Sequence, residues 1–490
     1  MTRATKDNRD SLRKQLHGVL PKTSILETDE QTRPYECDGL TAYQQKPWIV
    51  VLPETIEQVQ NVLILCYNEG VPVVARGAGT GLSGGALPLA NGVLLSLAKF
   101  NRILDVNPAN RSAIVEPGVR NLAISQAAEE FNLYYAPDPS SQIACTIGGN
   151  VAENAGGVHC LKYGLTVHNI LQLKIITIDG ELITIGSQAL DTPGYDLLAL
   201  MTGSEGMLGV IVEVTVKLLP RPEQAQVILA AFDDVVKAGE SVGAIIAEGI
   251  IPAGLEMMDN PAIRAAEEYA HAGYPIDAEA ILLCELDGTQ EEVTEQIKFV
   301  EELLTKKGAT SLRTSQNEEE RLKLWLGRKS AFPAVGRISP DYYCMDGTIP
   351  RKQLPFILQK ISELSEEYGL LVANVFHAGD GNLHPLILYD ANIEGELART
   401  EEFGGKILEL CVEAGGAITG EHGVGKEKID QMCVQFKSLE LQIFHDIKHS
   451  FDPHELLNPG KAVPTLHRCA ELGGMHVHDG LLAHPGLERF

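Results

Sequence analysis

Two histidines in the C-terminal half are of a type and spacing that could bind a metal ion. His377 and His384 flank the turn-forming residues 379–382, and apolar runs lie on either side. These runs predict two strands joined by a turn, a hairpin that brings the two imidazoles opposite each other. With a carboxylate as third ligand they could hold one zinc, iron or manganese ion. Because His-x6-His is not a standard metal spacing, two polar loop histidines remain the alternative.

An acid and a base stand side by side in the glycine-rich segment 420–425, where Glu421 precedes His422. A helix is predicted just before, over residues 404–413. Glycine permits backbone conformations and close approaches that other residues do not. The segment can therefore turn both side chains inward, toward a bound molecule. A surface loop with ordinary charges is the alternative interpretation.

The glycine-rich segment 76–85 follows a predicted strand and is typical of a phosphate-binding loop. Its closely spaced glycines allow backbone amides to surround a diphosphate. Gly79, Gly81 and Gly84 also satisfy the dinucleotide fingerprint, but that motif requires a helix directly afterwards. Residues 86–92 instead lead into a strand. The sequence context therefore excludes a Rossmann domain.

A second group of segments, 137–141, 146–150 and 154–157, is rich in small residues and side-chain amides. Such residues let a flat ring and its phosphate chain lie against the backbone. Tight turns in a β-rich domain are the alternative.

The elements that must position these residues fall into two domains. An N-terminal helix and loop (1–47) precede a β-rich domain (48–221), in which a strand, a helix and a strand over 48–75 predict a βαβ unit. Pro220 and Pro222 predict the domain boundary. Alternating strands and helices over 222–452 predict an α+β domain, with an antiparallel sheet and helices on one side. Residues 453–464 are expected to return to the first domain, and 465–490 to form a tail of unknown use.

Composition narrows the classes of function. The 490 residues imply two or three domains, and a net charge of −26 disfavours nucleic acid and anionic lipid as partners. An anionic substrate would need a locally positive site. The nine cysteines lack a C-x-x-C pair, so a metal cluster is not expected and most should be buried reduced thiols. The charged N-terminus and the lack of a long apolar run predict a cytoplasmic protein.

Several segments together resemble one family of flavoproteins, in which a vanillyl-alcohol-oxidase-type FAD-binding domain precedes an FAD-linked oxidase C-terminal domain. The segments are 76–85, 136–157, 202–209 and 458–461. Longer runs at 34–39, 156–164 and 339–346 resemble the glycolate-oxidising branch of this family. The resemblance implies an α+β fold: a two-subdomain FAD-binding α/β region plus an antiparallel-sheet substrate (cap) domain with flanking helices.

The resemblance also implies the cofactors and their ligands. FAD is expected without a covalent link, because neither glycine-rich segment has a histidine or cysteine at an evident linking position. The implied diphosphate contacts are Arg76, Gly77, Ala78, Gly79, Thr80, Gly81, Leu82, Ser83 and Gly84. The implied flavin and ribityl contacts are Pro137, Thr146, Gly149, Asn150, Asn154 and Gly156, with Ile211 and Asn458 as further cofactor contacts. A divalent metal would be held by His377, His384 and Glu421.

The implied catalytic residues are His422 as general base and Arg328 as partner of the substrate carboxylate. A solvent-facing helix arginine is the alternative for Arg328. A metal chelated by a 2-hydroxy acid lowers the pKa of the hydroxyl, an imidazole can then take the proton, and hydride can leave C2 for the flavin. The expected reaction is the oxidation of glycolate, and of D-lactate, to the 2-oxo acid.

The electrons would have to go onward, since no cluster is expected in this chain. The resemblance implies an iron–sulfur subunit and a second FAD-domain subunit of a glycolate oxidase complex as neighbours, with membrane quinone as eventual acceptor. The chain would then be cytoplasmic, or held peripherally at the inner membrane through these subunits. The alternatives are a D-lactate or other D-2-hydroxy-acid dehydrogenase, a non-catalytic flavin electron-transfer or scaffold subunit, and a metal hydrolase without flavin.

Two positions bear on substrate size. Relatives that accept dicarboxylic 2-hydroxy acids tend to carry a lysine at the place of Cys344 and a smaller hydroxyl residue at the place of Phe332. The pocket here is therefore expected to be shorter and less polar, and a second carboxylate would be buried in it without a partner. The alternative is that both residues belong to the core and point away from the site.

Overall fold

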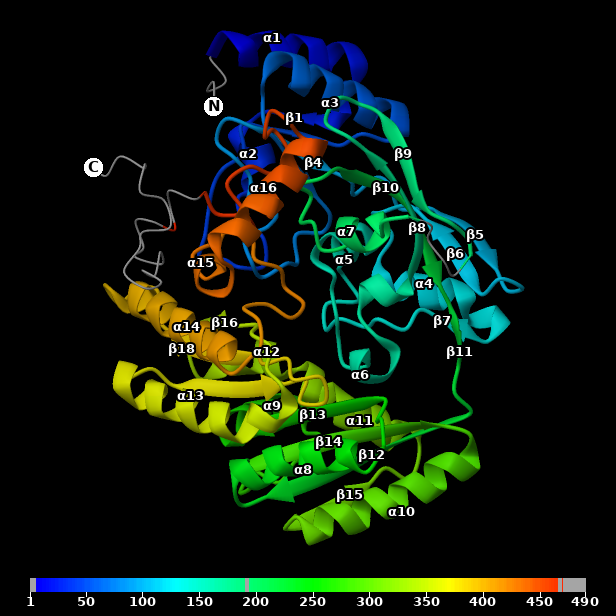
Figure 1. Cartoon of the computed structure of the whole chain (residues 1–490), viewed down its shortest axis with the longest axis vertical. Coiled ribbons are helices and arrows are strands. Elements are labelled where there is room, and N and C mark those ends of the chain that lie inside the picture. The colour runs from blue at the N-terminus through cyan, green and yellow to red at the C-terminus, as the bar shows by residue number, and fades with distance from the viewer. Residues whose placement is uncertain (1–5, 190–193, 466–468, 470–490) are drawn as a thin grey trace.

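The computed structural model describes residues 6–189, 194–465 and 469, and they form two lobes (Figure 1). The upper lobe in this view holds the N-terminal half and the helix α16 (Ser438–Phe451), and the lower lobe holds the middle of the chain. Most of the tail predicted over 465–490 lies outside the described residues. None of the helices within these ranges is long and apolar enough to cross a membrane.

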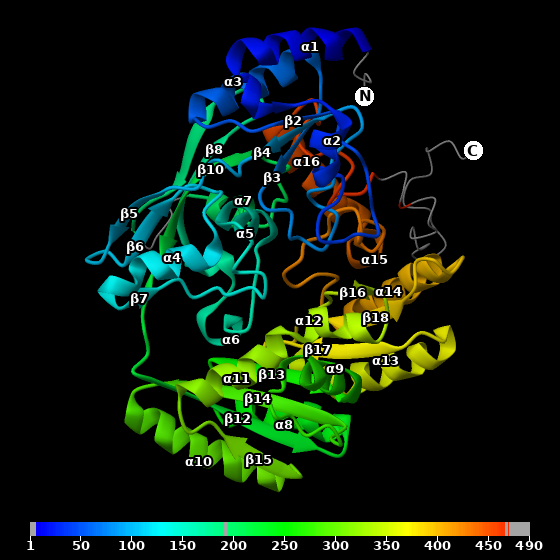
Figure 2. The ribbon, with the colours of Figure 1, turned by 180° about the vertical axis from the view of Figure 1, so that it is seen from behind.

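The upper lobe begins with helix α1 (Lys6–Val19), which packs on α3 (Ile56–Glu69) at the far end of the molecule (Figures 1 and 2). Leu12 and Leu16 of α1 are completely buried there. The helix α3 begins after Thr55, whose side chain accepts the backbone N–H of Gln58, and ends at Gly70 in the left-handed conformation.

The first sheet of this lobe has the strand order β1-β2-β4-β3. Its strands are β1 (Ile25–Leu26), β2 (Ile49–Val51), β4 (Val93–Ser96) and β3 (Val73–Arg76). The strands β2, β4 and β3 are parallel, and α3 connects β2 to β3, so the predicted βαβ unit is confirmed. Leu457 runs parallel to Val73 at the edge of β3, which brings the segment that follows α16 back to this lobe.

A second, antiparallel sheet has the order β5-β6-β10-β8-β9. Its strands are β5 (Ile103–Asn107), β6 (Ser112–Val115), β10 (Val210–Lys217), β8 (Ile170–Ile176) and β9 (Leu182–Gly186). The helices α4 (Asn121–Ala128), α5 (Ile147–Glu153) and α7 (Leu197–Met201) contact its strands, whereas α6 (Cys160–Tyr163) contacts the lower lobe. Residues 86–92 lead into β4 without a helix, as predicted, so the dinucleotide fingerprint in the preceding loop has no Rossmann context.

The lower lobe is one antiparallel sheet with the order β15-β12-β14-β13-β17-β18-β16. Its strands are β15 (Ser311–Thr314), β12 (Gln224–Phe232), β14 (Ala280–Gly288), β13 (Gly254–Asp259), β17 (Val372–Phe376), β18 (Pro385–Tyr389) and β16 (Asp341–Cys344). The predicted hairpin is confirmed, because β17 and β18 pair antiparallel. The first strand of the lower lobe along the chain, β12, begins shortly after the boundary predicted at Pro220 and Pro222. The exact domain limits stay a prediction.

Helices cover both faces of this sheet, so the expectation of helices on one side is wrong. On one face lie α8 (Val235–Ala247), α10 (Gln290–Lys306), α13 (Leu354–Tyr368) and α14 (Glu396–Glu413), and on the other α9 (Asn260–Ala270), α11 (Glu318–Lys329) and α12 (Ala331–Ala334). The reason is visible in β14, where Leu282 and Cys284 enter one core while Ile281 and Leu283 enter the other. A strand that is apolar at consecutive positions needs cover on both faces.

The sequence reasoning missed β13, β16, α9 and α16. The run Gly-Leu-Glu-Met-Met-Asp of β13 lacks β-branched and aromatic residues, so strand propensity gives little signal there. The cysteine spacing also gave no sign of the disulfide between Cys433 and Cys469, whose Cα atoms lie 5.4 Å apart. The other seven cysteines are free, and all but Cys37 are buried, as expected.

A charged cluster joins the two lobes beside α6. The ring of His159 lies between two carboxylates, with Nδ1 3.0 Å from Asp138 Oδ2 and Nε2 3.1 Å from Glu285 Oε1. Arg321 of α11 pairs with Glu285 at 2.7 Å, and Lys329 lies 3.5 Å from Asp138. Asp138 and His159 belong to the upper lobe and the other three to the lower, so the cluster fixes one lobe against the other.

Protonation of His159 should make this contact depend on pH. Burial would lower the pKa of His159, but Asp138 and Glu285 raise it to about 10. Burial would raise the pKa of both carboxyls, but His159 is the main group that holds each at about 2. The contribution of this cluster to the free energy of unfolding should therefore be complete between about pH 4.5 and 6.5. It should be lost as pH rises toward 10 or falls toward 2.

We expect the thermal unfolding midpoint of the wild type to fall more between pH 6 and pH 9.5 than that of His159→Gln. The variant lacks the group whose proton is lost in this range. His449→Gln, which changes an exposed histidine, should follow the wild type. The same pH dependence in wild type and His159→Gln, measured at one scan rate, would remove His159 from this role.

Candidate active site

A cavity of about 640 Å³ holds most of the residues singled out from the sequence. Its walls come from the segments 75–86 and 139–155 of the upper lobe, from residues around 329–342 of the lower lobe, and from His377, His384, Glu421 and His422. The two chemical groups predicted separately, the glycine-rich loops and the histidine cluster, therefore open into one space.

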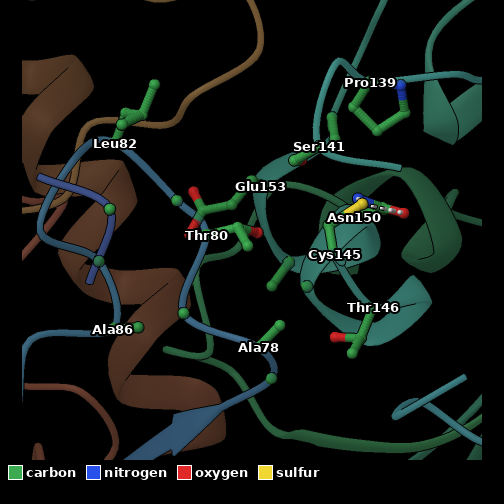
Figure 3. Close-up of a pocket in the computed structure, with 18 of the residues that line it drawn as sticks. Ala78, Thr80, Leu82, Ala86, Pro139, Ser141, Cys145, Thr146, Asn150 and Glu153 are labelled. Carbon is green, nitrogen blue, oxygen red and sulfur yellow. Dashed lines mark hydrogen bonds between the residues drawn. The ribbon is translucent and has the colours of Figure 1, made fainter. Parts of the chain in front are cut away.

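Figure 3 shows the upper-lobe part of this cavity. Ala78, Thr80, Leu82 and Ala86 lie on one side, and Pro139, Ser141, Cys145, Thr146 and Asn150 lie on the other. Between the two walls is the side chain of Glu153. Asn150 donates a hydrogen bond to Cys145 Sγ at 3.4 Å, which fixes the amide at the first turns of α5.

The backbone of the loop 76–85, which follows β3, packs closely against neighbouring segments. Gly79 and Gly84 have φ values of +73° and +74°, in the region that favours glycine. A Cβ on Gly77 would lie 2.3 Å from Thr146 Oγ1, so only glycine lets the loop approach the start of α5. This arrangement leaves backbone amides at the cavity wall, as a diphosphate site needs.

The predicted cofactor contacts divide into residues that line the cavity and residues that support it. Those that line it are Arg76, Gly77, Ala78, Gly79, Thr80, Gly81, Leu82, Thr146, Gly149, Asn150 and Ile211. The others, Ser83, Gly84, Pro137, Asn154, Gly156 and Asn458, are not among the lining residues. Asn458, for example, donates to Gly85 O at 3.1 Å and to Glu205 O at 2.7 Å, and so holds the end of the loop.

The N-terminal segment contributes residues that the sequence reasoning treated only as a loop. Gly39 lines the cavity, and its N–H donates to Gly81 O at 2.9 Å. Arg76 Nη1 donates to Cys37 O at 2.8 Å. Residues 37–39 therefore clamp the glycine-rich loop from outside. The run 34–39, which resembles the same family, could have indicated Gly39, because a glycine follows an aspartate there.

Two carboxyl groups, the partly buried Glu153 and the buried Glu205, also line the cavity and were not predicted. Glu205 accepts the backbone N–H groups of Val424 and Gly425, both at 2.7 Å, and so ties the loop after His422 to the upper lobe. Glu153 Oε2 is buried without a hydrogen-bond partner among the described residues. Burial raises the pKa of Glu153 well above its ordinary value, and the nearby Glu205 adds to this.

The histidine cluster brings together the three predicted metal ligands. His384 Nε2 lies 3.0 Å and His377 Nε2 3.4 Å from Glu421 Oε1, and ligand atoms of all three lie within 4.8 Å of one another. The rings of the two histidines are perpendicular, with centroids 4.9 Å apart. Glu421 Oε2 is buried without a hydrogen-bond partner among the described residues. Two imidazoles and a carboxylate with an unsatisfied oxygen fit a zinc, iron or manganese ion.

Residues behind the cluster orient it. Glu256 of β13 lies 2.9 Å from His377 Nδ1, which leaves Nε2 toward Glu421. Arg328 Nη2 in turn lies 2.6 Å from Glu256 Oε2, with both side chains almost completely buried. Such carboxylate–histidine contacts fix the ring and its tautomer in metal sites. Glu256 escaped prediction because β13 was not recognised as a strand.

The charges in this cluster are strongly coupled. Burial alone would raise the pKa of Glu421, but His377 and His384 hold it well below its ordinary value. Burial would lower the pKa of His377, but Glu256 and Glu421 raise it. A protonated imidazole cannot bind a metal, so a metal would have to displace this proton.

His422 is placed as a neutral imidazole next to the ligands. Its ring stacks on that of His384 with centroids 4.9 Å apart, and its backbone N–H donates to Asp346 Oδ2 at 2.9 Å. Burial lowers the pKa of His422 to about 4. Its Nδ1 is buried without a hydrogen-bond partner among the described residues. A neutral imidazole of this kind can accept a proton.

Asp346, at the end of the run 339–346, anchors the loop that carries Glu421 and His422. It is completely buried and accepts the backbone N–H groups of Gly420 and Glu421 as well as that of His422. Lys428 Nζ pairs with it at 3.1 Å. The segment 420–425 is therefore held by the buried Asp346–Lys428 pair. This contact rules out the alternative that Glu421 and His422 belong to a surface loop with ordinary charges.

Arg328 lies behind the cluster, and its role as partner of the substrate carboxylate stays a prediction. Its Nε and Nη2 are buried without a hydrogen-bond partner among the described residues. Its side chain is 1% exposed and faces Glu256, and it is not among the residues that line the cavity. A solvent-facing helix arginine is thereby ruled out. The next residue, Lys329, does line the cavity.

The two substrate-size positions lie on the histidine side of the cavity. Phe332 lines it, with its ring centroid 6.1 Å from that of His384, so the alternative that Phe332 points away is wrong. Cys344 is buried and its Sγ lies within 4.8 Å of ligand atoms of His384 and His422, although Cys344 is not among the lining residues.

Comparison with known proteins identifies the family. Residues 47–186 match the FAD binding domain, and residues 221–462 match the C-terminal domain of FAD linked oxidases. The solved structure of p-cresol methylhydroxylase with substrate bound is similar in fold, with a TM-score of 0.81 over 95% of this chain and 98% of that chain at 18% identity. The chain belongs to the family of FAD-linked oxidases.

Relatives over nearly the whole length narrow the comparison. The glycolate oxidase subunit GlcD of Escherichia coli (strain K12) is 67% identical over 483 residues, which cover 99% of this chain and 97% of that protein. GlcD of Bacillus subtilis (strain 168) is 39% identical over 87% of this chain and 91% of that protein. The D-lactate dehydrogenase of Archaeoglobus fulgidus is 33% identical over 86% of this chain and 92% of that protein.

Proposed function

We propose that this chain oxidises a small 2-hydroxy acid, glycolate first and D-lactate second, to the 2-oxo acid with FAD as electron acceptor. The observation that carries the proposal is the single cavity in which the loop 76–86 and the cluster of His377, His384, Glu421 and His422 meet. The names of the relatives, glycolate oxidase subunits and D-lactate dehydrogenases, support the substrate class.

Each part of the cavity has one task in this proposal. The backbone amides of residues 76–82 would hold the FAD diphosphate, and Thr146, Gly149 and Asn150 would face the rest of the cofactor. Bound FAD would supply an acceptor for the hydride of the substrate. The protein's contribution is to set the substrate carbon against the flavin and to keep water out.

The histidine cluster has the complementary task of handling the proton. His377, His384 and Glu421 would hold a divalent ion, which would supply a Lewis acid that lowers the pKa of the hydroxyl. The hydroxyl proton would pass to the free imidazole nitrogen of His422. Neutral at physiological pH through its burial, His422 can act as this base without first losing a proton.

We further propose that FAD is held without a covalent bond. Cys145 lines the cavity, but it lies against the Asn150 amide, and burial raises the pKa of its thiol, so its reactive thiolate is disfavoured. We expect acid precipitation of the purified protein to release all of the flavin. Yellow colour that stays with the precipitate in the wild type, and disappears in Cys145→Ser, would show a covalent link at this residue.

Substrate preference follows from the histidine end of the cavity. Phe332 narrows it, and the buried Cys344 offers no charge to a second carboxylate. We expect kcat/KM, measured with a dye as acceptor, to be at least about tenfold higher for glycolate and D-lactate than for D-2-hydroxyglutarate, because a buried unpaired carboxylate is costly. D-2-hydroxyglutarate as the best substrate would contradict both the pocket and the glycolate assignment.

Electron transfer beyond the flavin is proposed to need partner proteins. The described residues hold no cluster of cysteines, so an iron–sulfur subunit and a second FAD-domain subunit would carry electrons toward membrane quinone. The chain would stay cytoplasmic or sit at the inner membrane through those subunits. Affinity purification from the native cell should recover them, and recovery of this chain alone, fully able to reduce quinone, would contradict the proposal.

A further inference from the structure

We propose that a second cavity, of about 230 Å³, binds a small organic cation that carries several N–H groups. The cavity lies between the N-terminal segment, α14 and the segment that follows His422. Its described lining residues are all different from those of the cavity that holds the histidine cluster. The polar groups that a ligand would meet there belong to Tyr43, Tyr343, Glu401, Lys426, Glu427 and Asp430.

The strand β16 separates this second cavity from the histidine cluster. Tyr343 of β16 and Met345 directly after it line the second cavity. Cys344, which stands between them, lies near the imidazoles of the histidine cluster instead. Successive side chains of a strand point to opposite faces of the sheet. The second cavity is therefore a separate site behind the histidine cluster, and the inference does not depend on the proposed function.

Glu427 is the main sign that this cavity takes a ligand. Its side chain is 2% exposed, and neither carboxyl oxygen has a hydrogen-bond partner among the described residues. Lys428 Nζ lies 3.7 Å from Glu427 Oε2. The three donors of this ammonium group are directed to other oxygens, those of Asp346 at 3.1 Å, Gly423 at 2.9 Å and Thr419 at 3.5 Å.

The cost of burying Glu427 is visible in its titration. Burial is the main cause that raises the pKa of Glu427 to about 8, against the attraction of Lys428. A buried carboxyl group without a hydrogen-bond partner is costly. A ligand that brought N–H groups and a positive charge to this carboxyl group would remove that cost.

The two tyrosine hydroxyls of the cavity also leave acceptors for a ligand. Tyr43 donates to Glu401 Oε1 at 2.8 Å, so the hydroxyl of Tyr343, 3.3 Å away, is left to donate to Tyr43. Both hydroxyl protons are then used, whereas lone pairs of Tyr343 and of the carboxylates remain. A ligand that complements these groups has to bring hydrogen-bond donors.

The charge of the lining residues indicates that the ligand is a cation. Glu401, Glu427 and Asp430 line the cavity, and among its described lining residues only Lys426 is basic. The local charge is therefore negative even when Glu427 is protonated. The exposed Lys426 places its Nζ over the ring of Tyr43, 5.0 Å from the centroid, which shows that an ammonium group can pack on this wall.

An organic cation fits the spacing of these carboxyl groups better than a metal ion does. Within the described part of the chain, groups of three His, Cys, Asp or Glu with ligand atoms within 4.8 Å of one another occur only around His384. Glu401, Glu427 and Asp430 do not form such a group, so they do not surround one ion. A diamine with an ammonium group at each end can instead reach separate carboxylates. A volume of about 230 Å³ holds a molecule of several heavy atoms.

The competing interpretation is that water and Lys426 alone satisfy the acidic groups. The test uses the FAD-loaded protein and isothermal calorimetry, without turnover. The probe is linear diaminobutane, with an amine at each end. Its controls are butanediol, a neutral molecule of the same length, and Mg²⁺ as the metal alone. Glu427→Gln is compared with wild type and with Glu409→Gln, a partly exposed carboxylate of α14 outside the cavity. Glu401→Gln replaces Glu427→Gln if that variant loses FAD.

We expect one diamine to bind per chain with a Kd of about 1 mM or below. The Kd should rise roughly tenfold to a hundredfold in Glu427→Gln, the range for loss of a charged hydrogen bond. Glu409→Gln should match wild type, and butanediol and Mg²⁺ should give no Glu427-dependent heat. Wild type that binds no diamine, or that binds it as tightly as Glu427→Gln does, would overturn the proposal. Diamine binding that appears only in Lys426→Met would show that Lys426 itself fills the site, and Glu427-dependent binding of Mg²⁺ alone would show a metal site; either result also overturns the proposal.

Discussion

Glu421→Gln should leave the protein folded and FAD-loaded but without its metal and without turnover. The amide keeps the size of the side chain and removes the negative charge that lies 3.0 Å from His384 Nε2 and 3.4 Å from His377 Nε2. Without that charge two neutral imidazoles remain, which bind a divalent ion weakly. We expect bound metal, measured by elemental analysis after dialysis, to fall from about one per chain to near zero. The rate should fall by three or more orders of magnitude.

The matched control is Glu409→Gln, a partly exposed carboxylate of α14 that pairs with Lys406. It should keep both metal and turnover. His384→Ala provides a second test, because it removes a different ligand from the same group. Metal content equal to that of wild type in both Glu421→Gln and His384→Ala would show that these residues do not form a metal site.

His422→Ala should have a different effect: the metal and the FAD should stay, and the rate should fall by about 10²–10⁴-fold, the usual contribution of a general base. The reason is the place of His422, whose ring stacks on His384 while Glu421 Oε1 is 3.8 Å from its Nε2. It lies beside the ligands, and its Nδ1 has no hydrogen-bond partner among the described residues. The loss should appear in the rate of flavin reduction under single-turnover conditions.

The control for this variant is His449→Ala, an exposed histidine of α16, which should behave as wild type. Flavin absorbance and elemental analysis of His422→Ala would show whether both cofactors are retained. Flavin reduction near the wild-type rate in a fully loaded His422→Ala protein would exclude His422 as the base.

Local patterns predicted much of the fold because the elements concerned have strong local signals. The helix α3 has a capping threonine at one end and a glycine at the other, and the hairpin β17–β18 is two apolar runs around a polar turn. The strand β13 has neither feature. Its burial comes from neighbours distant in sequence, which a local pattern cannot show.

The residues of the candidate site also divide into those with a local sequence signal and those without one. His377, His384, Glu421 and His422 stand out by residue type, and the loop 76–85 stands out by its glycines. Gly39, Glu153 and Glu205 do not, because each reaches the cavity only through contacts between lobes or between remote segments. The direction of a helical side chain is equally hidden. Of two adjacent cations on α11, Arg328 is buried beside Glu256 and Lys329 lines the cavity.

The central claim is that one chain binds FAD and uses it to oxidise a small 2-hydroxy acid. Its most direct test is the anaerobic mixing of the purified, FAD-loaded protein with glycolate while the flavin absorbance near 450 nm is followed. We expect the band to bleach, D-lactate to bleach it more slowly, and glyoxylate to appear in an amount equal to the flavin reduced. A flavin that dithionite reduces but that neither acid bleaches, in protein with its full complement of metal, would contradict the claim.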